Sequence, residues 1–139
     1  SFSAALVPAA IFLFGAFVSF STGSSWGTFA IMMPLAIPMA QAFSIPFAIA
    51  VGAVLSGGLF GDHCSPISDT TILSSTGAEC DLVEHVRPAA YALVNGVIAL
   101  IAFIIAGATK SAVSLGFAVV ALIVVVFVIN KVFNKKAAA

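Results

Sequence analysis

Charged residues are scarce in this sequence. Its 139 residues include five acidic and five basic ones, so the formal net charge at neutral pH is zero. By contrast, 62% of the residues are hydrophobic, a share well above that of ordinary water-soluble domains. The composition excludes a soluble globular domain and predicts an all-α polytopic membrane protein, with the lipid bilayer as its main partner. The balanced charge also argues against nucleic acid as a partner.

Cysteine is equally sparse, which excludes a disulfide-stapled secreted scaffold. The only two cysteines are Cys64 and Cys80. A zinc site could be drawn from both of them together with His63 and His85, but their spacing matches no paired-ligand pattern. We therefore expect no structural metal and no cofactor. The sequence starts without methionine or a basic region, so no cleavable signal peptide is expected.

Two uninterrupted apolar runs lie in the second half of the chain. Residues 89–108 and 111–129 each approach the length of about 20 residues that a spanning helix needs. Before them, Asp81 and Glu84 have the spacing of a capping box, and Pro88 suits the first turn of a helix. We therefore expect a short polar helix outside the membrane, followed by two transmembrane helices.

The basic residues predict the orientation of these spans. Most of them follow the last apolar run, at Lys131, Lys135 and Lys136. By the positive-inside rule, the C-terminus is then cytoplasmic, and residues 76–87 lie on the same side. This topology is that of a multi-pass protein of the bacterial plasma membrane. Residues 137–139 are set aside because three terminal alanines could be an added tail.

Two earlier apolar stretches are interrupted by polar clusters. The stretch 2–41 breaks at 21–28 (STGSSWGT), and the stretch 45–75 breaks at 61–66 (GDHCSP). Irregular backbone at membrane depth is tolerated only where it is buried in protein or lines a cavity. The first stretch is then a re-entrant hairpin or two spans, although its break could also be an external loop. The second stretch is predicted to be a discontinuous helix.

The second break carries the candidate chemistry. Asp62 and Asp69 are carboxylates in an otherwise apolar run, and such residues mark functional sites. Gly61 suits the end of one half-helix, while Ser65 as N-cap and Pro66 at the first position suit the start of the next. Two helix ends would then face one spot, and the missing amide of Pro66 would free a carbonyl near Asp62.

Hard cations prefer oxygen ligands, and this region is rich in them. We expect a sodium and proton site built from Asp69, Asp62, Ser65, Ser68, Thr70 and Thr71, with Ser24 and Ser25 from the first break. Asp69 is the first choice for a carboxylate that sodium and protons share, because both ions would compete for the same oxygens. His63 is a further titratable group and a candidate modulator of proton binding.

The motif GDHCSPISDTT at 61–71, followed by ILSS at 72–75, resembles the signature region of the NhaC-type sodium/proton antiporters. Residues 21–28 and 87–91 (RPAAY) are similar as well. The resemblance implies an ion-transporter fold with inverted repeats, in which residues 1–136 are the C-terminal repeat. It implies secondary active transport, with sodium as the transported substrate and protons as its counter-ion. The other repeat is the missing transporter half: either a partner chain supplies it or the fragment is inactive, and a homodimer is left open.

Other functions remain open at this point. An exchanger of organic acids or amino acids would fit the same helix ends, because a helix N-terminus can hold a carboxylate. A cation channel or a membrane assembly subunit would fit the same composition. An intramembrane aspartyl protease does not fit, because Leu59 replaces the first glycine of its Gly-x-Gly-Asp pattern. We therefore expect a transporter and not an enzyme.

Overall fold

The computed structural model describes residues 2–87, 92–111 and 113–137. All regular structure in these ranges is helical, which agrees with the predicted class. The elements are α1 (Phe2–Thr22), α2 (Ser25–Ala42), α3 (Phe47–Cys64), α4 (Asp69–Gly77), α5 (Leu82–Val86), α6 (Ala92–Thr109) and α7 (Val113–Ala137).

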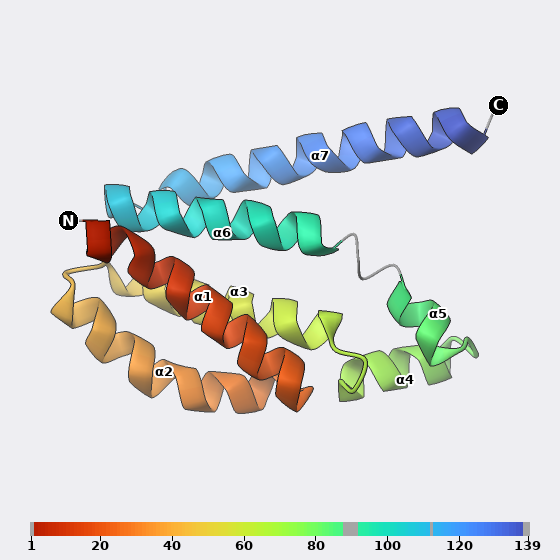
Figure 1. Cartoon of the computed structure of the whole chain (residues 1–139), viewed down its shortest axis with the longest axis horizontal. Helices are drawn as coiled ribbons and strands as arrows, with labels where there is room; N and C mark the ends of the chain where they lie inside the picture. The colour runs from red at the N-terminus through yellow and green to blue at the C-terminus, as the bar shows by residue number, and fades with distance from the viewer. Residues whose placement is uncertain (1, 88–91, 112, 138–139) are drawn as a thin grey trace.

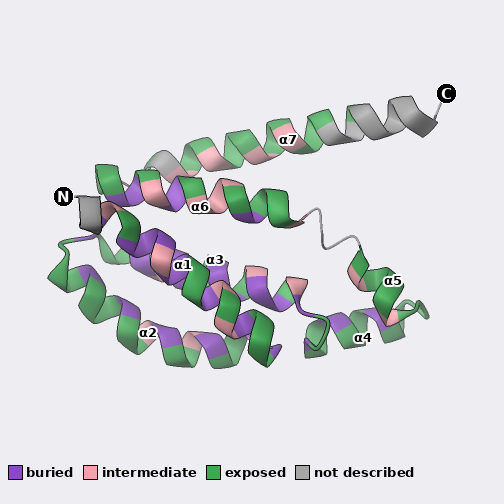
Figure 2. Ribbon diagram, viewed as in Figure 1, coloured by how far each residue is buried: buried purple, intermediate pink, exposed green. Residues whose placement is uncertain are grey.

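Helix α1 lies at the centre of the bundle (Figure 1). It packs against α3 along most of its length, and also against α2 and α6. Helix α7 packs on α6, away from α1, while α4 and α5 lie together beyond the end of α3. Buried residues gather where α1 and α3 meet, and α7 is largely exposed (Figure 2). The core is apolar there, with Ile11, Ile49 and Val54 among its fully buried side chains.

Glycines allow α1 and α3 to approach closely. A Cβ added at Gly57 would collide with the carbonyl of Phe12, and one added at Gly61 would collide with the carbonyl of Ala16. The two glycines lie four residues apart, which is the small-residue spacing that brings membrane helices into backbone contact. We call the contact of Gly57 and Gly61 with α1 the glycine seam, and it sets how closely α3 packs against α1.

Three helices in the described part of the chain are long and apolar enough to cross a membrane: Ala4–Thr22, Phe47–Cys64 and Ala92–Thr109. The third agrees with the predicted span at 89–108. The first residues of that span, and Pro88 just before it, lie outside the described ranges. The predicted span at 111–129 falls on α7, where the described apolar stretch Leu115–Val128 is shorter than a full span.

The first break separates two helices. Only Gly23 and Ser24 lie between α1 and α2, which pack against each other. Helix α2 holds Pro34 and Pro38 in its interior and, although it has 18 residues, is not apolar enough to be a candidate span. A re-entrant hairpin at this position stays a prediction.

The second break occurs where a discontinuous helix was predicted, but its boundaries were predicted wrongly. Helix α3 runs through Gly61 and Asp62 to Cys64, and the N-cap of α4 is Ser68 instead of Ser65. The cause is Pro66, which disfavours helical geometry at the preceding residue and leaves Ser65 extended, with ψ at 126°. The carbonyl of Asp62 is not free either, because it accepts the amide of Ser65 at 3.0 Å.

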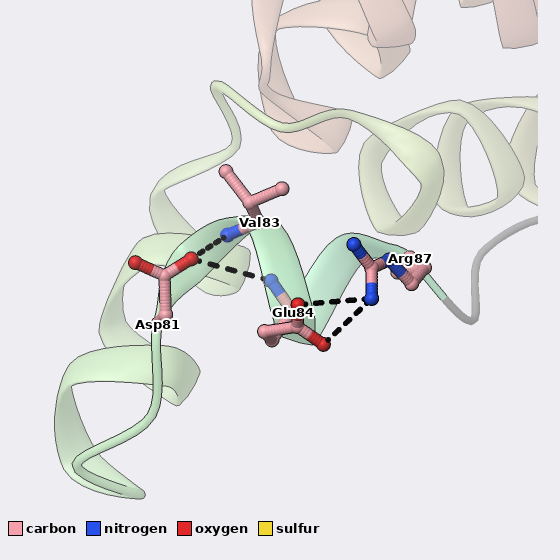
Figure 3. Close-up of polar contacts among 4 residues, drawn as sticks. All are labelled: Asp81, Val83, Glu84 and Arg87. Carbon is pink, nitrogen blue, oxygen red and sulfur yellow. Dashed lines mark hydrogen bonds and ion pairs between the residues drawn. The ribbon is translucent and has the colours of Figure 1, made fainter.

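The short helix before the last two apolar runs is present as α5 (Figure 3). As predicted, the Asp81 side chain caps it, accepting the amides of Val83 at 2.8 Å and Glu84 at 3.3 Å. Glu84 does not complete a capping box but pairs with Arg87, at 3.0 Å between Oε1 and the guanidinium. Both side chains of this ion pair are exposed, so it adds little stability.

Candidate functional site

The two polar breaks meet in space. Gly23, in the link from α1 to α2, has a φ of +66°, and a Cβ there would lie 2.7 Å from the carbonyl oxygen of Ile67 and 3.1 Å from the amide of Ser68. Only glycine adopts this φ without strain and leaves room for the backbone of the second break. The link between α1 and α2 therefore lies directly against the link between α3 and α4 (Figure 1).

One carboxylate lies at this junction, and it belongs to Asp62. The residue is 2% exposed, in the last turn of α3. Its Oδ1 accepts the hydroxyl of Ser68 at 2.7 Å, and its Oδ2 accepts those of Ser25 at 3.3 Å and Thr70 at 3.4 Å. The hydroxyl oxygens of Ser68 and Thr70 are 2.7 Å apart. We call these four residues the Asp62 cluster.

The electrostatic setting of Asp62 comes from helix ends and hydroxyls. Ser25 is the first residue of α2 and Ser68 is the N-cap of α4, so two helix N-termini, each with partial positive charge, lie beside the carboxylate. Within the described ranges the only ion pair joins Glu84 and Arg87. No basic side chain there neutralises Asp62.

Asp69 lies outside the cluster. It is the first residue of α4 and is exposed, and its Oδ1 accepts the amide of Thr70 at 2.9 Å. No hydrogen bond joins it to Asp62. Thr71 is buried in the first turn of the same helix but does not hydrogen-bond to Asp62 either. A direct role for Asp69 or Thr71 in ion binding therefore stays a prediction.

Three other predicted site residues have different contacts. Ser24 caps α2, where its hydroxyl accepts the amide of Gly27 at 3.3 Å. Ser65 is fully buried, and its hydroxyl donates to the carbonyl of Phe20 at 2.7 Å, near the end of α1. His63 is exposed. Ser65 thus joins the second break to the end of α1, Ser24 stabilises only the start of α2, and neither hydroxyl hydrogen-bonds to the carboxylate of Asp62.

The residues considered for zinc do not assemble. Cys80 and His85 approach each other, with 3.9 Å between Sγ and Nδ1. Across the part of the chain that the structure describes, no three His, Cys, Asp or Glu side chains come close enough together to hold a metal. The polar junction of the breaks is the stronger candidate site.

One residue of this region was not predicted from the sequence. Ser19 is fully buried in α1, and its hydroxyl donates to the carbonyl of Gly58 in α3 at 2.6 Å. In the sequence it is a single hydroxyl in a long apolar run, which no motif distinguishes. Its position two residues before the polar break at 21–28 is the signal that could have identified it.

Long apolar helices around a buried, hydroxyl-lined carboxylate define a class: multi-pass membrane proteins with a polar site between broken helices. The comparisons with known proteins narrow this class. The chain belongs to the Na+/H+ antiporter family, which matches residues 2–108. The predicted resemblance to NhaC-type antiporters is thereby confirmed.

Relatives are found in several bacteria. The chain is 45% identical over 129 residues to an uncharacterised protein of Haemophilus influenzae, covering 90% of this chain and 25% of that protein. It is 38% identical over 91 residues to the malate-2H+/Na+-lactate antiporter of Bacillus subtilis, covering 65% of this chain and 19% of that antiporter. It is 37% identical over 95 residues to the Na+/H+ antiporter NhaC of Alkalihalophilus pseudofirmus, covering 68% of this chain and 21% of that antiporter. The chain thus spans a quarter or less of these relatives, and no solved structure matches it significantly.

Proposed function

We propose that this chain forms part of a secondary antiporter that exchanges sodium for protons at Asp62. The observation that carries the proposal is a buried carboxylate whose hydrogen-bond donors are all neutral hydroxyls. An ionised carboxylate in a low-dielectric interior is costly unless another charge offsets it. A bound sodium ion or a bound proton would each remove that cost, and each would occupy the same oxygens.

The cluster offers the ligands that a hard cation prefers. Asp62 provides two carboxylate oxygens, and Ser25, Ser68 and Thr70 provide hydroxyl oxygens within 3.4 Å of them. A serine or threonine hydroxyl can rotate, so its lone pairs can face a cation instead of its hydrogen facing the carboxylate. Sodium would bind to this oxygen set, and a proton would bind to Asp62 in its place.

Asp69 and His63 have secondary roles in this proposal. Both are exposed and flank the break, one in the first turn of α4 and the other in the last turn of α3. The negative charge of Asp69 would attract cations toward the cluster, and His63 would modulate proton binding. The protein would lie in the bacterial plasma membrane with its C-terminus in the cytoplasm, and a further transporter segment or chain would complete the pathway.

Asp62→Asn tests the proposal, with Asp69→Asn as the matched control. The amide keeps the shape of the side chain but loses its charge and its proton site. In proteoliposomes containing the full-length transporter, we expect Asp62→Asn to reduce sodium-driven proton flux to background and Asp69→Asn to retain flux. Near-normal exchange in Asp62→Asn would overturn the proposal. Flux that persists without a counter-gradient would indicate a channel instead.

A second candidate is exchange of a small carboxylate, as the name of the Bacillus subtilis relative suggests for that protein. One structural feature favours it. A cavity of about 300 Å³ beside the second break is lined by Pro66, Leu82, Val83, Val86 and Arg87. Its lining is almost wholly apolar, which suits the hydrocarbon part of a small organic anion. The guanidinium of Arg87 is paired with Glu84, so the carboxylate of such an anion would compete with Glu84 for it. Proton flux driven by a lactate gradient at constant sodium would support this candidate, and its absence would exclude lactate as a substrate.

A further inference from the structure

Ser19 contacts the two segments that carry Asp62 and Ser25. Its side chain is 0% exposed, and its hydroxyl donates to the carbonyl of Gly58 at 2.6 Å. Its own carbonyl accepts the amide of Gly23 at 2.8 Å and the hydroxyl of Thr22 at 3.5 Å. One residue of α1 is therefore bonded to α3 on one side and to the start of the α1–α2 link on the other.

The bond to Gly58 acts on the turn of α3 that carries Asp62. In an α-helix, the carbonyl of a residue pairs with the amide four positions later, which makes Gly58 the acceptor position for Asp62. This turn also contains Gly57 and Gly61, and glycine lowers the stability of a helix interior by about 1 kcal/mol relative to alanine. The glycines make this turn of α3 intrinsically weak, and the buried hydroxyl of Ser19 in α1 stabilises it.

The bond to Gly23 acts on the other side of the cluster. Gly23 ends α1 with a positive φ and lies two residues before Ser25. Its amide donates to the carbonyl of Ser19, so Ser19 also fixes the start of the backbone link that leads to Ser25. The hydroxyl of Ser25 donates to Oδ2 of Asp62 at 3.3 Å, so the two segments that Ser19 contacts meet at this hydrogen bond.

We propose that Ser19 is a positioning residue for the ion site: it sets where Asp62 lies relative to Ser25, without itself contacting the ion. This inference rests on the proposed exchange at Asp62. It predicts that Ser19 affects how tightly sodium binds more than how fast the loaded transporter turns over. A purely structural residue would instead change the amount of folded protein and leave the sodium affinity of the remainder unchanged.

Ser19→Ala tests this role, with Ser21→Ala as its matched control. Ser21 lies on the same helix, but it is exposed and its hydroxyl bonds only within α1, to the carbonyl of Phe17 at 2.8 Å. In proteoliposomes with the full-length transporter, we expect Ser19→Ala to raise the half-saturating sodium concentration about three- to tenfold, the range of one lost hydrogen bond. Its maximal rate should change less, and Ser21→Ala should match the unmodified protein. Equal sodium affinities in both variants would overturn the inference.

Ser19→Cys separates the hydrogen bond from packing. A thiol is close in size to the hydroxymethyl group but is a weak donor, so the half-saturating concentration should lie between those of the unmodified protein and Ser19→Ala. A cysteine variant with unmodified affinity would show that volume matters and not the bond, which contradicts the inference. If Asp62→Asn retains exchange, the proposed function itself fails. If Asp62 is required but Ser19→Ala behaves like Ser21→Ala, only the positioning role fails.

Discussion

The hydroxyl of Ser25 donates to Oδ2 of Asp62 at 3.3 Å, although the two residues are 37 positions apart in the sequence. Ser25 begins the helix after the first polar break, and Asp62 lies in the last turn before the second. The candidate site therefore belongs to neither break alone. It forms because the glycine seam of α1 and α3 brings both breaks to the same end of the bundle.

The shortest hydrogen bond to the Asp62 carboxylate predicts the largest effect of a hydroxyl deletion. Ser68 is fully buried and donates to Oδ1 of Asp62 at 2.7 Å, and hydrogen bonds to charged groups are stronger than neutral ones. We expect Ser68→Ala to raise the half-saturating sodium concentration about tenfold or more. Ser74→Ala is the control, because this exposed hydroxyl of α4 bonds only to the carbonyl of Thr70 in its own helix. Similar sodium affinities in the two variants would mean that Ser68 is not a ligand.

The pH dependence of sodium binding follows from the shared site. If sodium and protons share one carboxylate, a bound proton excludes sodium, because it removes the charge that attracts the cation. Apparent sodium affinity should therefore fall with falling pH, and raising sodium should weaken proton binding by the same factor. Isothermal titration at several pH values measures this. A sodium affinity that stays constant from mildly acidic to alkaline pH would rule out a shared site.

The glycine seam predicts a sharp contrast between two alanine substitutions in α3. Gly61→Ala would place a methyl group against the carbonyl of Ala16, and neither backbone can move without separating the helices. We expect a loss of about 1–3 kcal/mol or more in the free energy of unfolding. Gly52→Ala is the control, because nothing lies within 4 Å of its added Cβ, and it should stabilise the helix by up to about 1 kcal/mol. Thermal unfolding in detergent would show the difference, and equal stabilities would contradict the close packing.

Much of the fold could be predicted from the sequence because hydrophobic runs and proline act locally. The run at 89–108 predicted a spanning helix, and the polar cluster with Pro66 predicted a break in the second stretch. The exact ends of the helices depended on contacts that are distant in sequence. Gly61 was interpreted as a helix end, but it packs against α1. Ser65 was interpreted as a cap, but its hydroxyl is bonded to the carbonyl of Phe20.

The site was predicted as a region, but its internal arrangement was not. The motif at 61–71 placed two carboxylates in one polar segment, and nothing in the residue order indicates which of them faces α1 and α2. The structure buries Asp62 there and leaves Asp69 exposed. Ser19 could not be ranked either, because the carbonyl that its hydroxyl needs belongs to a residue 39 positions away.

The irregular residues 65–68 have a mechanical consequence. They form the short connection between Asp62, which is fixed in α3, and Ser68 and Thr70, which belong to the start of α4. Ser25 reaches the carboxylate from a third helix. A rotation of α4 about this connection would thus pull two hydroxyls away from Asp62 and leave one in place. The cluster would therefore open on the side of α4, while the glycine seam keeps α3, which carries Asp62, fixed against α1.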